Sequence, residues 1–182
     1  SSGKMGYALA RAAWEAGATV TLVSGPTALV APPNVRMISV TTAQEMHDAV
    51  MREIKKMAIF IGVAAVADYH VAHIAQQKLK KTKTAPTLTL EPNPDILAKV
   101  AALSKAPFCV GFAAEPEKLS EHAQAKRATK AIPLIIANRA QDTLGQDEST
   151  LILIDSNGSH ALPRQAKLLS ARLVIKHIAS LL

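Results

Sequence analysis

The stretch at residues 59–83, IFIGVAAVADYHVAHIAQQKLKKTK, decides the fold. Its first residues, 59–65, form an apolar run that is typical of a buried parallel strand. Asp68 follows this predicted strand, and a cluster of lysines begins at Lys78. A carboxylate beyond the carboxyl end of a strand can accept hydrogen bonds from a base or a sugar, and lysines can neutralise phosphates. The stretch therefore indicates an α/β sheet with a site for a nucleoside triphosphate.

The rest of the chain alternates apolar and polar segments as repeated βα units do. Further strands are predicted at 19–24, 35–40, 87–90, 108–114 and 133–138, and helices at 3–16, 43–56, 94–103 and 117–131. After a polar loop at 141–149, we expect a hairpin over 151–162 that turns at Asn157-Gly158, and then a helix at 164–182. The predicted fold is a Rossmann-like, open, mostly parallel sheet with helices on both faces and an antiparallel C-terminal hairpin, in one domain over 1–182.

Two local signals support these helix boundaries. Gly17 stands where a glycine ends a helix, after the predicted helix at 3–16. Thr42 and Glu45 have the spacing of a capping box at the start of the helix at 43–56.

Composition limits the class of partner. The 182 residues carry a formal charge of +7, which favours an anionic ligand. Aromatic residues are only 3% and scattered, so they do not form the stacking platforms of single-stranded nucleic-acid binders. No apolar run has the length of a membrane span and no signal peptide is visible. The one cysteine, Cys109, sits in an apolar run and is expected to be a buried structural thiol in a reducing cytoplasm.

Several small or polar residues are predicted to follow the strands, where ligands gather in open parallel sheets. Each also has a plainer interpretation. The segment at 1–6 can simply start a helix, the lysine cluster can be a solvated loop, and Phe112 can be a core residue. Segment 1–6 is not a Walker motif because the spacing is wrong. The six histidines show no metal-ligand spacing, so no protein-built metal site is predicted.

Taken together, seven strings resemble the bacterial phosphopantothenoylcysteine synthetases, in the order in which that family carries them. They are SSGKMG (1–6), VTLVSGP (20–26), AAVADY (64–69), KLKKTK (78–83), NPDIL (93–97), GFAAE (111–115) and AN (137–138). The resemblance covers essentially the whole chain. It implies the synthetase domain of a bifunctional coenzyme A biosynthesis protein, whose other half is a decarboxylase that uses the flavin FMN.

The resemblance implies a CTP-dependent ligase. In that reaction the carboxylate of phosphopantothenate attacks the α-phosphate of CTP and forms an acyl-cytidylate with release of pyrophosphate. The amine of cysteine then forms the amide and releases CMP. Positive charge and Mg²⁺ are expected to offset the repulsion between the two anions. A homodimer is also implied.

Residue roles follow from the same resemblance. Asp68 is expected to recognise the base or ribose, and Lys78 to act as the catalytic lysine on the triphosphate. Phe112 is expected to pack on the cytosine ring, while Lys126 and Lys130 reach phosphate or base acceptors. The other expected contacts with the nucleotide or the acyl-cytidylate are Ser1, Ser2, Gly3, Lys4, Ala64, Ala65, Asn93, Pro94, Asp95, Ile96 and Leu97.

The start of the chain departs from the family pattern, which has an asparagine two residues before the first string and a preceding glycine-rich strand and turn. We therefore expect a domain without its N-terminal strand, an apolar gap in the sheet and poor turnover. Two alternatives remain. A Rossmann oxidoreductase using NAD(P) or flavin is disfavoured because no GxGxxG follows a strand. A non-enzymatic basic module would bind nucleic acid with a steep salt dependence.

Overall fold

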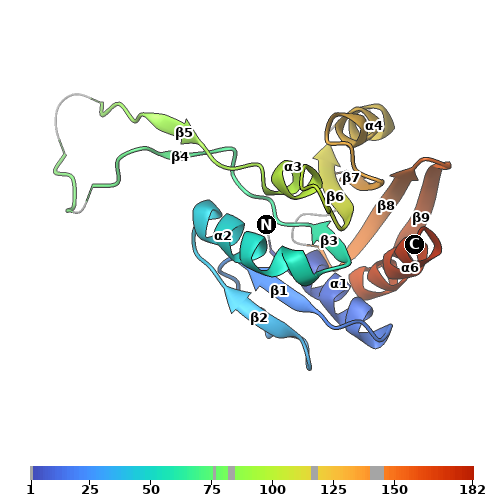
Figure 1. Ribbon diagram of the computed structural model, residues 1–182. Coiled ribbons are helices and arrows are strands. Elements are labelled where there is room, and N and C mark those ends of the chain that lie inside the picture. The colour runs from blue at the N-terminus through green and yellow to red at the C-terminus, as the bar shows by residue number, and fades with distance from the viewer. Residues whose placement is uncertain (1, 76, 82–84, 116–118, 140–145) are drawn as a thin grey trace.

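The central sheet has five strands in the order β3-β6-β7-β8-β9 (Figure 1). The computed structural model describes residues 2–75, 77–81, 85–115, 119–139 and 146–182. β3, β6 and β7 run parallel, and β8 and β9 complete the sheet as an antiparallel pair. The predicted mostly parallel sheet with an antiparallel C-terminal hairpin is confirmed. The strands are β3 (Ile59–Gly62), β6 (Phe108–Glu115), β7 (Leu134–Arg139), β8 (Glu148–Asp155) and β9 (Gly158–Ala166).

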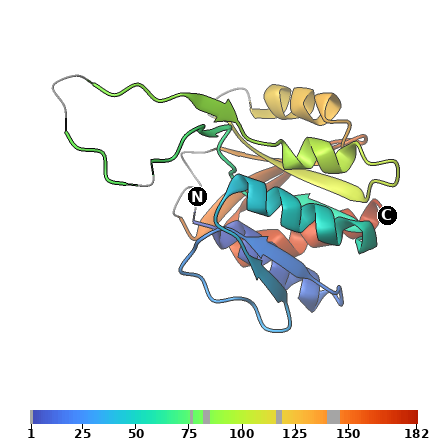
Figure 2. The ribbon, with the colours of Figure 1, turned by 60° about the vertical axis from the view of Figure 1, so that its left-hand side comes forward.

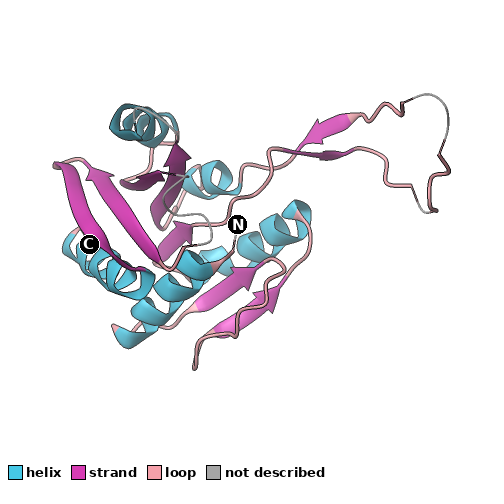
Figure 3. Cartoon of the chain, turned by 180° about the vertical axis from the view of Figure 1, so that it is seen from behind, coloured by secondary structure: helices cyan, strands magenta, loops and turns pink. Residues whose placement is uncertain are grey.

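Helices cover both faces of this sheet (Figure 3), because its strands send alternate side chains into two apolar clusters. On β7, Ile135 joins one cluster, whereas Leu134 and Ile136 join the other. Helices α2, α3 and α4 contribute to the first cluster, and α1 and α6 to the second. The helices are α1 (Lys4–Glu15), α2 (Ala43–Glu53) with a 3₁₀ turn η1 (Ile54–Lys56), α3 (Ile96–Ala101), α4 (Leu119–Thr129) and α6 (Lys167–Ser180).

Both predicted helix-boundary signals are confirmed. The Glu45 N–H donates to Thr42 Oγ1 at 3.1 Å, and the Thr42 N–H donates to the Glu45 carboxylate at 3.2 Å, which completes the capping box of α2. Gly17 adopts φ +90° after α1 and donates its N–H to the Trp14 carbonyl at 2.8 Å. A residue with a side chain would be strained in this left-handed conformation.

Two predicted boundaries were wrong because strand pairing overrode the local pattern. The alternating segment at 87–90 was predicted as a strand, but β5 lies at Leu90–Pro92, opposite β4. All residues at 85–92 are exposed, so the alternation meets no core. The last helix was predicted from residue 164, but it begins at Lys167 because β9 continues to Ala166, paired with Glu148 of β8.

The C-terminal hairpin is longer than predicted and turns one residue earlier. Asp155 pairs with Gly158, so the two-residue loop is Ser156-Asn157 instead of Asn157-Gly158. β8 already begins at Glu148, inside the segment predicted as polar loop, and residues 141–145 lie outside the described residues. Ser149 is buried and its hydroxyl donates to Ser170 Oγ at 3.4 Å, which ties this polar end of the strand to α6.

Two smaller sheets accompany the central one. β1 (Thr21–Ser24) and β2 (Arg36–Ser39) pair in parallel, and among the described residues no strand ladder joins β1 to β3. β4 (Tyr69–Val71) and β5 (Leu90–Pro92) form an antiparallel pair at the base of a long arm, which comprises the described residues 69–75, 77–81 and 85–92 and projects away from the body (Figures 1 and 2). In the part of the chain that the structure describes, no helix is long and apolar enough to cross a membrane. Cys109 is buried in the core as predicted, and burial raises the pKa of its thiol.

Candidate functional site

The carboxyl ends of the parallel strands bring together most of the residues that the sequence predicted for a nucleotide site. The ends of β6 and β7 lie side by side, since Ala114 pairs with Asn138, and β3 ends beside the middle of β6, where Gly62 pairs with Gly111. We call this region the rim. It comprises the first turn of α1, the end of β1 with residues 25–27, residues 63–68 after β3, residues 93–95 before α3, the end of β6 and Lys130.

The first turn of α1 is tied to the end of β1. Tyr7 Oη and Ser24 Oγ lie 3.1 Å apart, and Thr27 Oγ1 donates to the Ser2 carbonyl at 3.4 Å. Gly3 precedes the helix with φ +74°, no side chain caps this end and the first turn has no acidic residue. Backbone N–H groups at such a helix start, with the positive end of the helix dipole, suit a phosphate.

Lys4 adds a cation at the same end of α1. Its ammonium group donates to Asp147 Oδ1 at 2.6 Å. This bond and the charge of Lys4 hold the pKa of Asp147 below its ordinary value. Of the predicted residues in this segment, Ser2, Gly3 and Lys4 are half-buried, and Ser1 lies outside the described residues.

Asn93 connects two of the predicted segments. Its N–H donates to the Asp68 carbonyl at 2.8 Å, and its side-chain amide donates to the Ala67 carbonyl at 2.9 Å. These bonds hold the loop after β3 against the segment that leads into α3. Ala64, Ala65 and Asp68 are exposed in this loop, so their surfaces are accessible to a ligand.

Asp95 connects the next two segments. Its Oδ1 accepts the Ala98 N–H at 3.0 Å and caps α3, while Lys130 Nζ donates to its Oδ2 at 2.6 Å. Burial raises the pKa of Asp95, but the bonds from Lys130 and Ala98 outweigh burial and leave that pKa below its ordinary value. Lys130, just after α4, is therefore held beside the start of α3, and the Ala98 amide is already occupied by protein.

Three predicted residues lie in or against the core. Ile96 is buried, and Leu97 packs against the same apolar cluster. Their side chains therefore support the rim from below, and Pro94 is half-buried just before them. Phe112 is half-buried on the opposite face of β6, in the cluster that also includes Met5 of α1. Phe112 thus lies on the face of the sheet that α1 covers, and the first turn of α1 has the backbone N–H groups suited to a phosphate.

The structure does not bring the described lysines of the cluster, Lys78, Lys80 and Lys81, to the rim. Segment 77–81, with the exposed Lys78, lies toward the far end of the arm (Figure 2). Residues 82–84, which complete the cluster, lie outside the described residues. Lys126 is exposed on α4, one turn before Lys130.

Two shallow pockets lie away from the predicted residues. One, of about 220 Å³, is lined by residues of β2 and α2, including Ser39, Glu45 and Arg52. The other, of about 230 Å³, is lined by residues of β8, β9 and α6, including His160 and His177. None of the residues predicted for the nucleotide site lines either pocket.

The second pocket adjoins a cluster that the sequence analysis missed. Asp155, His160 and His177 offer one ligand atom each, all within 4.8 Å of one another. The prediction of no protein-built metal site rested on spacing along the chain, which does not show side chains brought together from a hairpin and a distant helix. The alternation of the hairpin was the available signal, because it places Asp155 and His160 on one face.

The chain is a mixed α/β domain with a mostly parallel central sheet, and such sheets bind their ligands beyond the carboxyl ends of the strands. The chain belongs to the family described as the DNA/pantothenate metabolism flavoprotein C-terminal domain, which matches residues 1–182. The family indicated by the seven sequence strings is thereby confirmed.

Known proteins with similar sequences and structures agree with this family. The coenzyme A biosynthesis bifunctional protein CoaBC of Vibrio vulnificus is 46% identical over 188 residues, which cover 100% of this chain and 47% of that protein. The crystal structure of a C-terminal domain of CoaBC matches with a TM-score of 0.84 and 34% identity, covering 100% of this chain and 83% of that one. The chain spans about half the length of the curated relatives that it matches.

A more distant structure shares the fold alone. A Cab2 mutant in complex with phosphopantothenate-cysteine matches with a TM-score of 0.79, at 15% identity, over 99% of this chain and 77% of that one.

Proposed function

We propose that this domain ligates 4′-phosphopantothenate to cysteine with consumption of CTP, as a step of coenzyme A biosynthesis. The observation that carries the proposal is the 46% identity to a protein named for coenzyme A biosynthesis, extending over the whole chain. The likeness of fold to a protein solved with phosphopantothenate-cysteine, the product expected here, supports the same substrate class. The relatives are named bifunctional and are about twice as long, which supports fusion to an FMN-dependent decarboxylase.

The proposed chemistry activates a poor acyl donor. A free carboxylate would have to expel oxide, so an amine cannot displace it directly. Attack of the phosphopantothenate carboxylate on the α-phosphate of CTP gives an acyl-cytidylate and pyrophosphate. The cysteine amine then attacks the acyl carbon, the bond to CMP breaks, and the amine loses a proton as the amide forms. The protein has to hold two anions together, which requires fixed positive charge.

The rim supplies groups suited to this task. The first turn of α1 and Lys4 offer donors to a phosphate, because helix-start amides and an ammonium group both favour negative charge. Lys130, fixed by Asp95, offers a second cation on the other side of the rim, with Lys126 one turn earlier. The exposed carboxylate of Asp68 is suited to accept hydrogen bonds from the base or ribose.

Phe112 is the aromatic residue proposed to meet the cytosine ring. Its side chain is half-buried in the apolar cluster that α1 also joins, so we expect a base to lie against its exposed part while the phosphates face the helix start. A base on an aromatic face gains stacking energy without requiring a particular hydrogen-bond pattern.

We expect a Mg²⁺ ion to arrive with the triphosphate and to need few ligands from the protein. Mg²⁺ commonly keeps several waters and uses one or two carboxylates together with phosphate oxygens. On the rim, Asp95 is engaged by Lys130 and Ala98, and Asp68 is the residue proposed for the base or ribose, so phosphate oxygens and water would hold most of the ion. When bound, Mg²⁺ would supply charge neutralisation on the phosphates.

The arm is proposed to serve both dimerisation and catalysis. It exposes large apolar side chains that one chain leaves in water, a feature that marks interaction surfaces. These side chains are Tyr69, Ile74, Leu79, Leu88 and Leu90. We expect them to pack against a second copy of the chain. Lys78, which stands away from its own rim, would then reach a triphosphate only after the arm bends or from a neighbouring copy.

A turnover assay tests the ligase directly. The protein is mixed with phosphopantothenate, cysteine and MgCTP, and CMP, pyrophosphate and the amide product are measured together. The proposal requires equal amounts of all three and dependence on both acceptor substrates. Omission of cysteine should still allow pyrophosphate release up to one equivalent per site. CMP formation that does not depend on phosphopantothenate, or reduction of a nicotinamide or flavin cofactor instead, would reject it.

The dimer has a separate test. Analytical ultracentrifugation of the wild type is compared with that of a variant carrying Leu88→Asn and Leu90→Asn. The molecular mass from sedimentation should be twice that of one chain for the wild type, and it should move toward the mass of one chain for the variant. A wild type that remains monomeric at all concentrations would contradict the dimer, without bearing on the ligase chemistry.

A further inference from the structure

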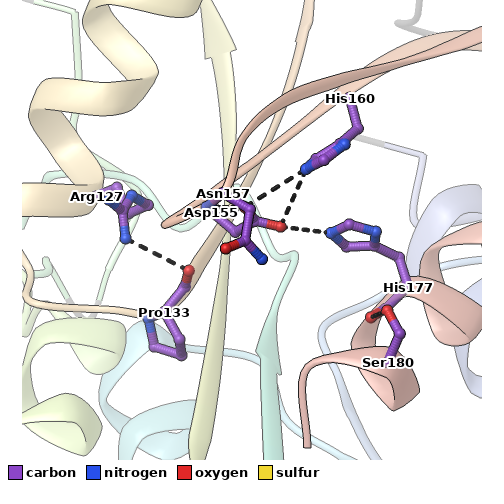
Figure 4. Close-up of polar contacts among 7 residues, drawn as sticks. All are labelled: Arg127, Pro133, Asp155, Asn157, His160, His177 and Ser180. Carbon is purple, nitrogen blue, oxygen red and sulfur yellow. Dashed lines mark hydrogen bonds and ion pairs between the residues drawn. The ribbon is translucent and has the colours of Figure 1, made fainter.

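Asp155, His160 and His177 point toward one another from three elements on the side of the molecule formed by the C-terminal hairpin and α6 (Figure 4). His177 Nε2 lies 2.7 Å from Asp155 Oδ2, and His160 Nε2 lies 3.3 Å from the same oxygen. The two imidazole rings have centroids 4.8 Å apart. The cluster lies outside the rim and has no part in the proposed ligase chemistry.

The fold places these side chains together through ordinary strand and helix periods. Asp155 ends β8, and it faces the same side of the hairpin as Leu153, two residues earlier. Leu153 pairs with His160 of β9, so His160 lies on that side as well. His177 follows Val174 by three positions on α6 and lies on the helix face that packs against the sheet.

The separations match the edges of a metal coordination shell. Nitrogen and oxygen ligands bind Zn²⁺ at about 2.0–2.2 Å, so two ligands at the tetrahedral angle lie about 3.3–3.5 Å apart, and at a right angle about 2.9 Å. The separation of 3.3 Å between His160 Nε2 and Asp155 Oδ2 equals the tetrahedral value, and the hydrogen-bonded separation of 2.7 Å between His177 Nε2 and the same oxygen has to lengthen by about 0.2 Å to reach the right-angle value. The remaining separation, between the two histidines, is within 4.8 Å, and one ion can bind both rings only if the exposed His160 ring moves closer.

We propose that Asp155, His160 and His177 bind one divalent transition-metal ion of the Zn²⁺, Co²⁺ and Ni²⁺ class. Two imidazoles and one carboxylate suit these ions better than Mg²⁺ or Ca²⁺, which prefer oxygen ligands throughout. Three protein ligands also leave a position for water or a small ligand from the adjoining pocket of about 230 Å³.

The surroundings hold the carboxylate in place. The Asn157 N–H donates to Asp155 Oδ1 at 2.6 Å, and Oδ2 lies toward His177, while His160 Nε2 lies between the two oxygens, 3.4 Å from Oδ1 and 3.3 Å from Oδ2. Such outer contacts orient ligands and strengthen metal sites. The Asp155 side chain is only 2% exposed, whereas the His160 side chain is 42% exposed, so the cluster has a buried anion and an open entrance.

One nearby cation opposes the ion. Lys176 lines the same pocket, next to His177 on α6. Lys176 is exposed, and its long side chain can keep the ammonium group in water. The buried carboxylate is therefore the nearest charge to the proposed ion.

The alternative is a structural cluster that binds no metal, in which the histidines only donate hydrogen bonds to Asp155. The alternatives differ in metal stoichiometry. The test uses untagged protein in equilibrium dialysis against Zn²⁺, with bound metal measured by mass spectrometry. The variants are His177→Gln and the pair His160→Gln with His177→Gln. His73→Gln serves as the matched control, because His73 is an exposed histidine of the arm.

The wild type and His73→Gln should each bind one Zn²⁺ more than the double variant. Loss of one ligand in His177→Gln should weaken this binding roughly tenfold or more. Circular dichroism checks that the variants are folded. A Co²⁺ absorption spectrum of the wild type gives a readout that does not depend on any variant, since four- or five-coordinate Co²⁺ absorbs more intensely than hexaaqua Co²⁺.

Equal Zn²⁺ stoichiometry in the wild type and the folded double variant would overturn the proposal. A Co²⁺ spectrum indistinguishable from that of the free ion would also overturn it, and this result would apply even if the double variant failed to fold. A loss of Zn²⁺ in His73→Gln as large as that in His177→Gln would assign the binding to scattered surface histidines.

Discussion

Replacing Gly111 by alanine tests how closely β6 supports the rim. A Cβ at this position would lie 2.8 Å from Leu97 Cδ2 and 2.9 Å from Ile132 Cδ1. Carbon atoms in good contact are about 3.5–4.0 Å apart, so one or both side chains must move. Overpacking of this kind typically costs about 1–3 kcal/mol. Alanine also lowers the conformational entropy of the unfolded chain, which offsets about 0.4–1 kcal/mol of this cost.

The net expectation for Gly111→Ala is a loss of about 1–2 kcal/mol in the free energy of unfolding. In a domain of this size each kcal/mol lowers Tm by about 2–4 °C. Leu97 directly follows the segment in which Asn93 holds the Asp68 loop and Asp95 holds Lys130. A displaced Leu97 should therefore also raise the KM for CTP.

Gly62→Ala is the matched control for this experiment. Gly62 pairs with Gly111 across the β3–β6 ladder, but its Cβ would meet Phe60 at 3.5 Å and Leu97 at 3.7 Å, which are ordinary contacts. The free energy of unfolding of Gly62→Ala should stay within about 1 kcal/mol of that of the wild type. Urea denaturation and thermal melts of both variants give the comparison. Equal stability of the two variants would refute the steric reasoning.

Three further predictions concern the arm, the base platform and the C-terminal cluster. Lys78→Gln should raise the KM for CTP in steady-state kinetics. The control is Lys55→Gln, which changes an exposed lysine on the 3₁₀ turn and should leave the KM unchanged. Equal KM values for the two variants would show that Lys78 has no role in the reaction. Phe112→Leu keeps an apolar side chain against α1 but loses the aromatic face, so calorimetry should show CTP binding weaker by roughly 1–3 kcal/mol, and unchanged affinity would reject stacking. Burial raises the pKa of Asp155, but hydrogen bonds from Asn157, His177 and His160 outweigh it and hold that pKa below its ordinary value of 3.8. A lowered folded-state pKa adds stability that is present above pH 3.8 and lost as pH falls through the folded value, so acid unfolding should be steeper in the wild type than in Asp155→Asn.

Much of the fold was predictable because the signals were local or strongly periodic. Apolar runs gave β3, β6 and β7, since strands buried on both faces need apolar residues in succession. The capping box at Thr42 and the glycine at Gly17 fixed helix ends through backbone requirements that depend on few neighbours. Strand and helix boundaries that depend on pairing between distant segments were harder to predict from the sequence. Nothing in the local sequence shows that residues 164–166 extend β9 to meet Glu148.

The candidate site was predictable in part for the same reason. The rim follows from the rule that parallel strands share a carboxyl edge, and the structure does bring Asp68 to Asn93 and Asp95 to Lys130. The sequence did not show that Asp95 caps α3 whereas Ile96 and Leu97 pack in the core, because these roles depend on contacts with other parts of the chain. The sequence also did not show that segment 77–81 lies on a projecting arm, since this depends on where the chain leaves the body (Figure 1).

Calorimetric titration of the protein with MgCTP, in parallel with MgATP and NADP, tests the central claim most directly. The account predicts saturable binding of one CTP per chain, weaker binding of ATP and no comparable binding of NADP. It also predicts that substitution of Asp68 by alanine lowers the affinity for CTP. NADP binding as tight as CTP binding, or a CTP affinity that ignores every substitution on the rim, would contradict it.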